Sequence, residues 1–168
     1  VKSRKYKPGQ ITLTRKQTHL LNHLSEKGFM VTNDNITAAE QADIIILAVR
    51  PAQTDELLLE LGPHCTQNHI VISVVTDVSL RTLYEKIPAN TPVVRAMPNI
   101  AIAIRESMTC LAAFPQHEQA LQEAEELFQI LGTTLVIDEQ LMVPATVLGA
   151  CGVAYFLRAI RAASQGGI

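Results

Sequence analysis

The stretch "DIIILAVRPA" at residues 43–52 decides the fold of this chain. After the aspartate come six apolar residues with no polar alternation, a pattern typical of a parallel strand covered by helices on both faces. Pro51 follows closely, and proline suits the first turn of a helix because its missing N–H would have no partner there. The stretch therefore predicts a strand at 43–49 and a helix from Pro51 to about residue 61.

Working outward, short β-branched runs alternate with runs of helical spacing along most of the chain. Further strands are expected at residues 11–14, 29–32, 69–76, 92–98, 107–114 and 133–138. Further helices are expected at residues 17–27, 36–42, 80–86 and 117–131. Asn35 and Ser79 are the expected N-caps of the second and third of these helices. The alternation predicts an α/β fold, with a mostly parallel sheet, flanking helices and an antiparallel edge.

From about Glu139 the pattern changes to a long, alanine-rich apolar stretch without strand punctuation. We interpret it as the first helix of a second, helical region, which divides the chain into residues 1–138 and 139–168. This helix has few partners for its apolar faces, so it should need a neighbouring chain or residues beyond those present. No single apolar run reaches the roughly 18 to 20 residues of a membrane-spanning helix.

Composition excludes several classes of function. Of the 168 residues, 48% are hydrophobic and 18% are charged, and the formal net charge is −2, which argues against a disordered chain and against general affinity for nucleic acid. Three cysteines lie far apart without a C-x-x-C spacing, and the five histidines show no metal-ligand spacing. These features favour a reducing, cytoplasmic setting, and the first residues show no secretory signal pattern.

Polar residues follow the expected strands. In an open α/β sheet, ligands bind beyond the carboxyl ends of the strands. The segments at these ends are residues 15–16, 32–35, 50–53, 76–77 and 97–99. They should form a polar ring around one crevice.

The usual dinucleotide signature is missing, because no G-x-G-x-x-G follows a strand. Either the domain binds no dinucleotide, or the chain begins after the first strand and its glycine loop, with residues 1–6 as the tail of the first helix. Arg15 and Lys16 favour the second explanation, since cations at the end of the second strand suit a ribose 2′-phosphate. From position alone, the two side chains could equally be exposed at a strand end.

Four segments, in this order and spacing, resemble the pyrroline-5-carboxylate reductase family: "ADIIILAVRPAQ", "VISVVTDVSL", "VVRAMPNIAIAIRESMTCLAA" and "TVLGACGVAY". The resemblance extends from about Ile11 to Ile168, and the "AVRP" and "RAMPN" pair is specific. It implies a Rossmann-like domain followed by the beginning of an all-α dimerisation domain. It also implies reduction of 1-pyrroline-5-carboxylate to proline, the last step of proline synthesis, with NADPH or NADH, in a homodimer or higher homo-oligomer.

Carried over position by position, the resemblance implies a set of site residues. Arg15 and Lys16 would lie at the ribose phosphate, Asn35 near the adenosine, and Val75-Thr76-Asp77 where the family usually has Ala-Ala-Gly. The implied cofactor-binding residues are Arg15, Lys16, Asn35, Ala48, Val49, Arg50, Pro51, Val75, Thr76, Asp77, Met97 and Pro98, and the implied catalytic residues are Met97 and Asn99.

Several positions depart from the family. Residues 149–155 replace the family's Ser-Gly-Ser-Gly-Pro-Ala-Tyr and lose two hydroxyls and a proline. Two acidic positions of the following helix are Arg161 and Gln165, and the family's substrate threonine would lie beyond Ile168. Two alternatives therefore stay open: a related reductase of another substrate, or a nucleotide-binding module without turnover.

Overall fold

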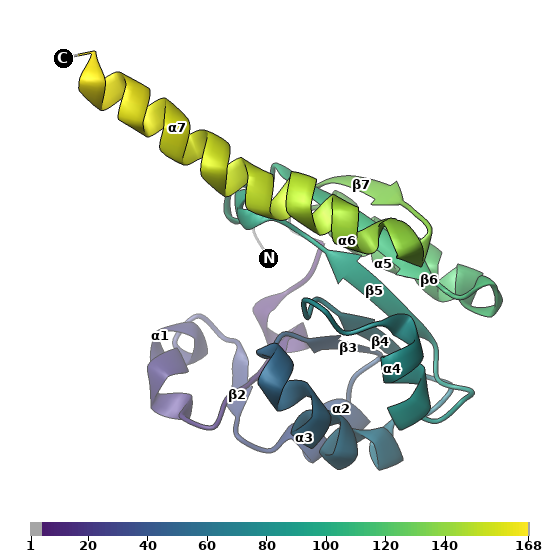
Figure 1. Ribbon diagram of the computed structural model, residues 1–168. Coiled ribbons are helices and arrows are strands. Elements are labelled where there is room, and N and C mark those ends of the chain that lie inside the picture. The colour runs from purple at the N-terminus through teal and green to yellow at the C-terminus, as the bar shows by residue number, and fades with distance from the viewer. Residues whose placement is uncertain (1–4, 168) are drawn as a thin grey trace.

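The computed structural model describes residues 5–167, which form an α/β body from which one long helix projects (Figure 1). The body contains a five-stranded sheet and a separate two-stranded sheet. The expected α/β class with a mostly parallel sheet is confirmed.

The larger sheet has the order β3-β4-β5-β6-β7. Its first three strands are parallel: β3 (Ile44–Leu47), β4 (Ile70–Ser73) and β5 (Val93–Met97). The fourth, β6 (Ser107–Ala113), is antiparallel to β5, and β7 (Gly132–Val136) is parallel to β6. The expected antiparallel edge is therefore two strands wide.

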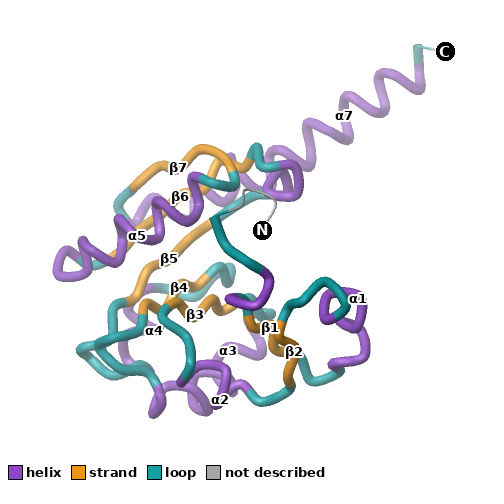
Figure 2. The backbone as a smooth tube through the Cα atoms, turned by 180° about the vertical axis from the view of Figure 1, so that it is seen from behind, coloured by secondary structure: helices purple, strands orange, loops and turns teal. Residues whose placement is uncertain are grey.

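The larger sheet has a core on each face. On one face, α3 (Pro51–Leu61) and α4 (Leu80–Lys86) bury leucines such as Leu58 and Leu83. On the other, α5 (Glu118–Gln129) packs Ala124 and Phe128 against β4, β5 and β6 (Figure 2). Ser79 caps α4 as expected, because its hydroxyl accepts the Thr82 N–H at 3.0 Å.

β3 departs from the expectation that helices cover both faces of its strand. Ile45 and Leu47 are buried, but Ile46 is 49% exposed. The reason is the position of α5, whose buried residues pack with apolar side chains of β4, β5 and β6. Full burial is found instead in β4, where every residue is buried.

The smaller sheet pairs β1 (Thr12–Thr14) in parallel with β2 (Met30–Thr32). The helix expected between them at 17–27 is wrong in length. A 3₁₀ helix (Thr18–Leu21) and the one-turn α1 (Asn22–Ser25) occupy this segment, and neither buries a side chain. Threonine, histidine and asparagine are modest helix formers, and without an apolar face to pack they do not sustain a longer helix.

Two short N-terminal features also differ from expectation. In α2 (Asn35–Glu40) the cap is Asp34 and not Asn35: the Asp34 carboxylate accepts the Thr37 N–H at 2.9 Å. The Asp34 N–H donates to the Thr32 hydroxyl at 3.0 Å, so the turn begins one residue earlier than expected. Residues 1–6 were expected to form the tail of a helix. Residues 1–4 lie outside the described residues, and residues 5–6 form a bend.

The C-terminal segment is one continuous helix from Glu139 to Gly166. It begins with a 3₁₀ turn (Glu139–Leu141), continues as α6 (Met142–Ala145), passes through a π-helical segment (Thr146–Cys151) and ends as α7 (Gly152–Gly166). Figure 1 shows α7 extending away from the body.

By length and composition alone, this helix could cross a membrane, although one such helix is weak evidence of a membrane span. The apolar residues are spread over 28 helical residues and do not form one run. The core helix of a soluble protein passes the same test, and here only 6% of the most apolar window is buried within the chain.

Candidate functional site

The carboxyl ends of the three parallel strands are in register. Leu47, Ser73 and Arg95 form one row across β3, β4 and β5. The segments that follow this row, at 48–51, 74–77 and 96–99, therefore leave the sheet at the same edge. Of the predicted residues at this edge, Val75 and Met97 are buried, Val49, Pro98 and Asn99 are half-buried, and Ala48, Arg50, Pro51, Thr76 and Asp77 are exposed.

Asn99 is held on three sides. Its N–H donates to the Ser107 hydroxyl at 3.1 Å, and its side-chain carbonyl accepts the Ala101 N–H at 3.0 Å. Its side-chain NH₂ donates to the Gly149 carbonyl at 3.0 Å. The amide of Asn99 thus ties the end of β5 to the π-helical segment, where hydrogen bonding departs from the regular α-helical pattern.

Arg95 makes a second connection between the sheet and the C-terminal helix. Its side chain is 5% exposed, and its guanidinium lies 3.3 Å from the Glu139 carboxylate, while its Nε has no partner among the described residues. Glu139 also accepts the Leu80 N–H at the start of α4. A buried guanidinium needs such a counter-ion, because an unpaired charge in the interior is strongly destabilising.

Sequence reasoning missed Ser107, Glu139 and Gly149 as partners of the site. For Glu139 the signal was present, since an arginine inside an apolar strand requires an acid nearby. Gly149 could not have been found, because the contact uses a backbone carbonyl.

Arg15 and Lys16 follow β1 in the smaller sheet and are both exposed. Lys16 lies 3.3 Å from Glu56 of α3, and both side chains are largely exposed. Arg15 has no acidic partner among residues 5–167, so its guanidinium is available to an anion. Asn35 is placed differently, because its amide donates to Glu60 of α3 at 3.2 Å.

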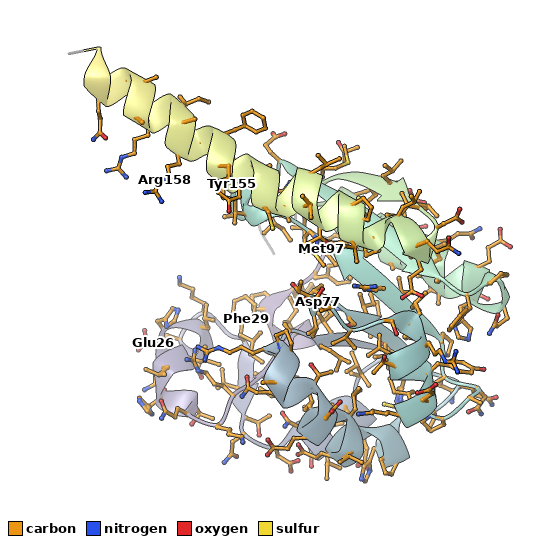
Figure 3. All side chains as sticks on the ribbon, viewed as in Figure 1. Glu26, Phe29, Asp77, Met97, Tyr155 and Arg158 are labelled. Carbon is orange, nitrogen blue, oxygen red and sulfur yellow. The ribbon has the colours of Figure 1, made fainter. Side chains whose placement is uncertain are left out.

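The turn after β4 has an unusual backbone. Asp77 has a φ of 61°, in the left-handed region that favours glycine. Figure 3 labels Asp77 in the turn after β4 and Met97 at the end of β5. The family that the sequence resembles usually has a glycine at this position. In this chain the residue is an aspartate, but its backbone adopts the conformation that favours glycine.

Two hollows of the described chain lie away from this edge, and one of them is lined by residues of α7. The other, of about 550 Å³, is lined by Glu40, Asp43, His64 and His69 among others. Asp43 and His69 directly precede β3 and β4, so this hollow lies at the amino ends of the strands, away from the candidate site. Within the part of the chain that the structure describes, no three histidine, cysteine, aspartate or glutamate side chains could hold a metal ion.

The residues present fit part of a dinucleotide phosphate. The free guanidinium of Arg15 suits a ribose phosphate, and the backbone turns after β3 and β4 lie where the sheet should accept a ligand. The sequence contains no glycine-rich loop for the diphosphate. The parallel sheet, its flanking helices and the polar residues at the carboxyl ends of the strands define a Rossmann-like α/β domain.

Comparisons with known proteins refine this class. The model of the family "NADP oxidoreductase coenzyme F420-dependent" matches residues 2–77. Pyrroline-5-carboxylate reductase 1 of Dictyostelium discoideum is 41% identical over 179 residues, which cover 99% of this chain. A solved pyrroline-5-carboxylate reductase from Coxiella burnetii superposes with a TM-score of 0.87 at 27% identity over 99% of this chain. The chain belongs to the pyrroline-5-carboxylate reductase family.

A third comparison concerns the fold alone. The Plasmodium falciparum pyrroline carboxylate reductase, solved with NADP bound, superposes over 99% of this chain with a TM-score of 0.85 at 20% identity. The chain spans 32% of the Dictyostelium protein, 64% of the Coxiella chain and 61% of the Plasmodium chain. It thus spans less than two thirds of each.

Proposed function

We propose that the protein reduces 1-pyrroline-5-carboxylate to proline with NADPH, with NADH as the alternative cofactor. Family membership supports the reaction, and the NADP bound to the Plasmodium neighbour supports the cofactor. The observation that carries the proposal is the bond from the Asn99 amide to the Gly149 carbonyl. It joins the end of β5, where the nicotinamide would lie, to the helical segment that would hold the substrate.

The residues of the site have separate roles in this proposal. Arg15 and Lys16 hold the ribose 2′-phosphate, and the turns at 48–51 and 75–77 line the cofactor. When bound, the reduced nicotinamide supplies the hydride. Met97 closes the site against water, and Asn99 positions the helical segment through the hydrogen bond from its NH₂ to the Gly149 carbonyl.

The reaction is tested by following oxidation of NADPH by the complete protein, with and without the pyrroline substrate. Substrate-dependent oxidation supports the proposal. Binding of NADPH without any acceleration by the pyrroline overturns it. In that case a screen of other imines and hydroxy acids distinguishes the two alternatives, because a related reductase would act on one of them and a non-catalytic nucleotide-binding module would not.

The cofactor preference is tested with Arg15→Ala. Loss of a charge-assisted contact should weaken NADPH binding about tenfold, and NADH binding should change little. Arg81→Ala is the matched control, because it removes a guanidinium from α4. If Arg15→Ala weakens the binding of NADPH and NADH equally, Arg15 does not recognise the ribose 2′-phosphate.

We further propose that α7 pairs with a second copy of the chain, so that residues 139–168 belong to a dimerisation domain. Phe156, Leu157 and Ile160 share one face of α7 and are each more than half exposed. The opposite face has Arg158, Arg161 and Gln165, so α7 is amphipathic and suits a subunit interface.

Sedimentation of the complete protein over a concentration series tests this pairing. Ile160→Asp should shift the protein toward monomer, and Ala162→Asp, off the apolar face, should not. An Ile160→Asp protein that stays associated contradicts the proposal.

The cytoplasmic location is also a proposal, supported by free cysteines at 65, 110 and 151.

A further inference from the structure

The C-terminal helix is attached to the five-stranded sheet at two polar points. The Arg95 guanidinium lies 3.3 Å from the carboxylate of Glu139, the first residue of this helix. Further along the helix, the Gly149 carbonyl accepts a hydrogen bond from the Asn99 NH₂ at 3.0 Å. Ten residues separate Glu139 from Gly149, which corresponds to about 15 Å along a helix. Two attachments this far apart define the tilt of the helix relative to β5, and one attachment would leave the tilt free.

Between these two points the helix is held by apolar contact. Met142 is fully buried, and the partly buried Ala145 packs against the same core. Apolar packing is not directional, so it holds the helix on the sheet without fixing its tilt. Beyond Gly149, α7 buries no residue against the described part of the chain, and Figures 1 and 2 both show it leaving the body. The tilt therefore depends on the two polar points.

The ion pair at the first point is suited to fixing geometry. The Arg95 side chain is 5% exposed, and the Glu139 oxygen that it contacts also accepts the Leu80 N–H, which holds the carboxylate in place. A buried ion pair is often no more stabilising than apolar side chains of similar volume, because both charges lose water. It is directional, however, since the N–H groups of a guanidinium lie in one rigid plane.

Resting on the proposed function, we infer that Arg95 is a positioning residue for hydride transfer: its ion pair with Glu139 sets the tilt at which the helical segment holds the substrate against the nicotinamide. The two polar points start from Arg95 and Asn99, on either side of Met97 at the end of β5. Without the ion pair the helix is free to pivot about Gly149. A displacement of about 1 Å between reacting groups slows a reaction by up to about a hundredfold, so a small change of tilt is measurable.

The test measures the single-turnover oxidation of bound NADPH by saturating pyrroline substrate in the complete protein, which separates the reaction step from binding. Arg95→Met removes the ion pair and leaves Glu139 partly exposed and bonded to the Leu80 N–H. The rate should fall about tenfold. The Kd of NADPH should change by less than about twofold, because the pair acts on the helix and not on the cofactor.

Glu139→Gln should have the opposite pattern of effects. Its amide oxygen can still accept both hydrogen bonds, so the geometry is kept and the rate should stay within about twofold of wild type. The buried Arg95 charge is left unpaired, so the thermal midpoint should fall further than in Arg95→Met. A positioning role predicts these opposite orders of rate and stability, and a purely structural role predicts the same order for both.

Two further variants complete the test. Arg95→Met combined with Glu139→Gln has no charge at the pair and should react as slowly as Arg95→Met alone, because the attachment is already absent. Arg81→Met is the matched control, since it breaks an exposed pair in which the Arg81 guanidinium lies 3.0 Å from the Glu85 carboxylate. It should leave the single-turnover rate unchanged.

The outcomes separate the inference from the proposed function. The inference is overturned if Arg95→Met and the double variant keep the wild-type rate, or if the loss of rate follows the loss of thermal midpoint across the variants. It is also overturned if Arg81→Met reproduces the fall. In these cases wild-type turnover still supports the proposed function. A wild-type protein without pyrroline-dependent oxidation overturns the proposed function, and the inference with it.

Discussion

The five-stranded sheet and the C-terminal helix both contain many apolar side chains, but they bury them to very different extents. Every residue of β4 and β5 is buried, while Tyr155, Phe156 and Ile160 of α7 are 74%, 73% and 65% exposed. Apolar content alone therefore does not say where a core lies. The sheet packs its apolar side chains within the chain, whereas α7 has no residue buried against the described part of the chain.

The largest expected effect on stability is in the sheet half of this comparison. Leu83→Ala removes a fully buried side chain between α4 and the sheet and should lower the free energy of unfolding by about 2–5 kcal/mol. Ile160→Ala, on α7, should change it by no more than about 0.5 kcal/mol at concentrations where the protein is monomeric. Urea unfolding with an unchanged slope measures both. Equal losses would mean that α7 is already packed in the monomer.

The next largest effect on stability is expected at the Arg95–Glu139 ion pair, which joins the sheet to the C-terminal helix. Glu139→Gln leaves the buried Arg95 guanidinium without its counter-ion and should cost about 3 kcal/mol, the lower end of the range for breaking a buried pair, because Glu139 is partly exposed. Glu118→Gln, at the start of α5, is the control for loss of one acid. Adding Arg95→Met to Glu139→Gln should restore part of the loss. If it restores none, the loss does not come from an unpaired Arg95 charge.

The sequence predicted the sheet well because parallel buried strands have a strong local signature. Residues 43–49, 69–76 and 92–98 each contain the strand that was expected. Helices that pack on this sheet were also found, and the helix at 17–27 was not, because its length depended on tertiary contacts that it lacks. The break of the C-terminal helix into 3₁₀, α and π parts has no clear periodic signal in "EQLMVPATVLGAC".

The candidate site was predictable only in part. Topology alone predicts that residues following parallel strands, such as Thr76 and Met97, lie at one edge of the sheet. Arg15 and Lys16 follow β1, which belongs to the separate two-stranded sheet, so the same argument does not place them at that edge. The family resemblance added Asn99, but its role in holding Gly149 depends on the angle between the sheet and the C-terminal helix. Such long-range geometry is not written in any local pattern.

Cysteine labelling compares the two regions directly. Cys65 and Cys110 are buried, burial raises the pKa of both thiols, and Cys151 in the π-helical segment is exposed. Since the thiolate is the reactive form, Cys151 should react at least about tenfold faster in a dilute native sample. Its rate should fall as protein concentration rises, if α7 pairs with a second copy. Mass spectrometry after timed alkylation measures each site, and equal rates at all three would contradict the burial of the sheet cysteines.

The smallest expected effect is a pH dependence at Asp34, which is exposed at the start of α2. The hydrogen bond from the Thr37 hydroxyl, with the one from the Thr37 N–H, lowers the pKa of this carboxyl below its ordinary value of 3.8. Because the folded pKa is the lower one, the stabilisation is fully present above the unfolded pKa. It is lost as the pH falls through the folded pKa. Asp34→Ala should therefore destabilise α2 at pH 7 and make progressively less difference as the pH falls below the ordinary value of 3.8. Hydrogen exchange of the α2 amides measures this locally, with Asp43→Ala as the control for an exposed, uncapped carboxylate. A difference between Asp34→Ala and wild type that persists undiminished in acid would mean that the carboxylate does not stabilise α2 through its charge.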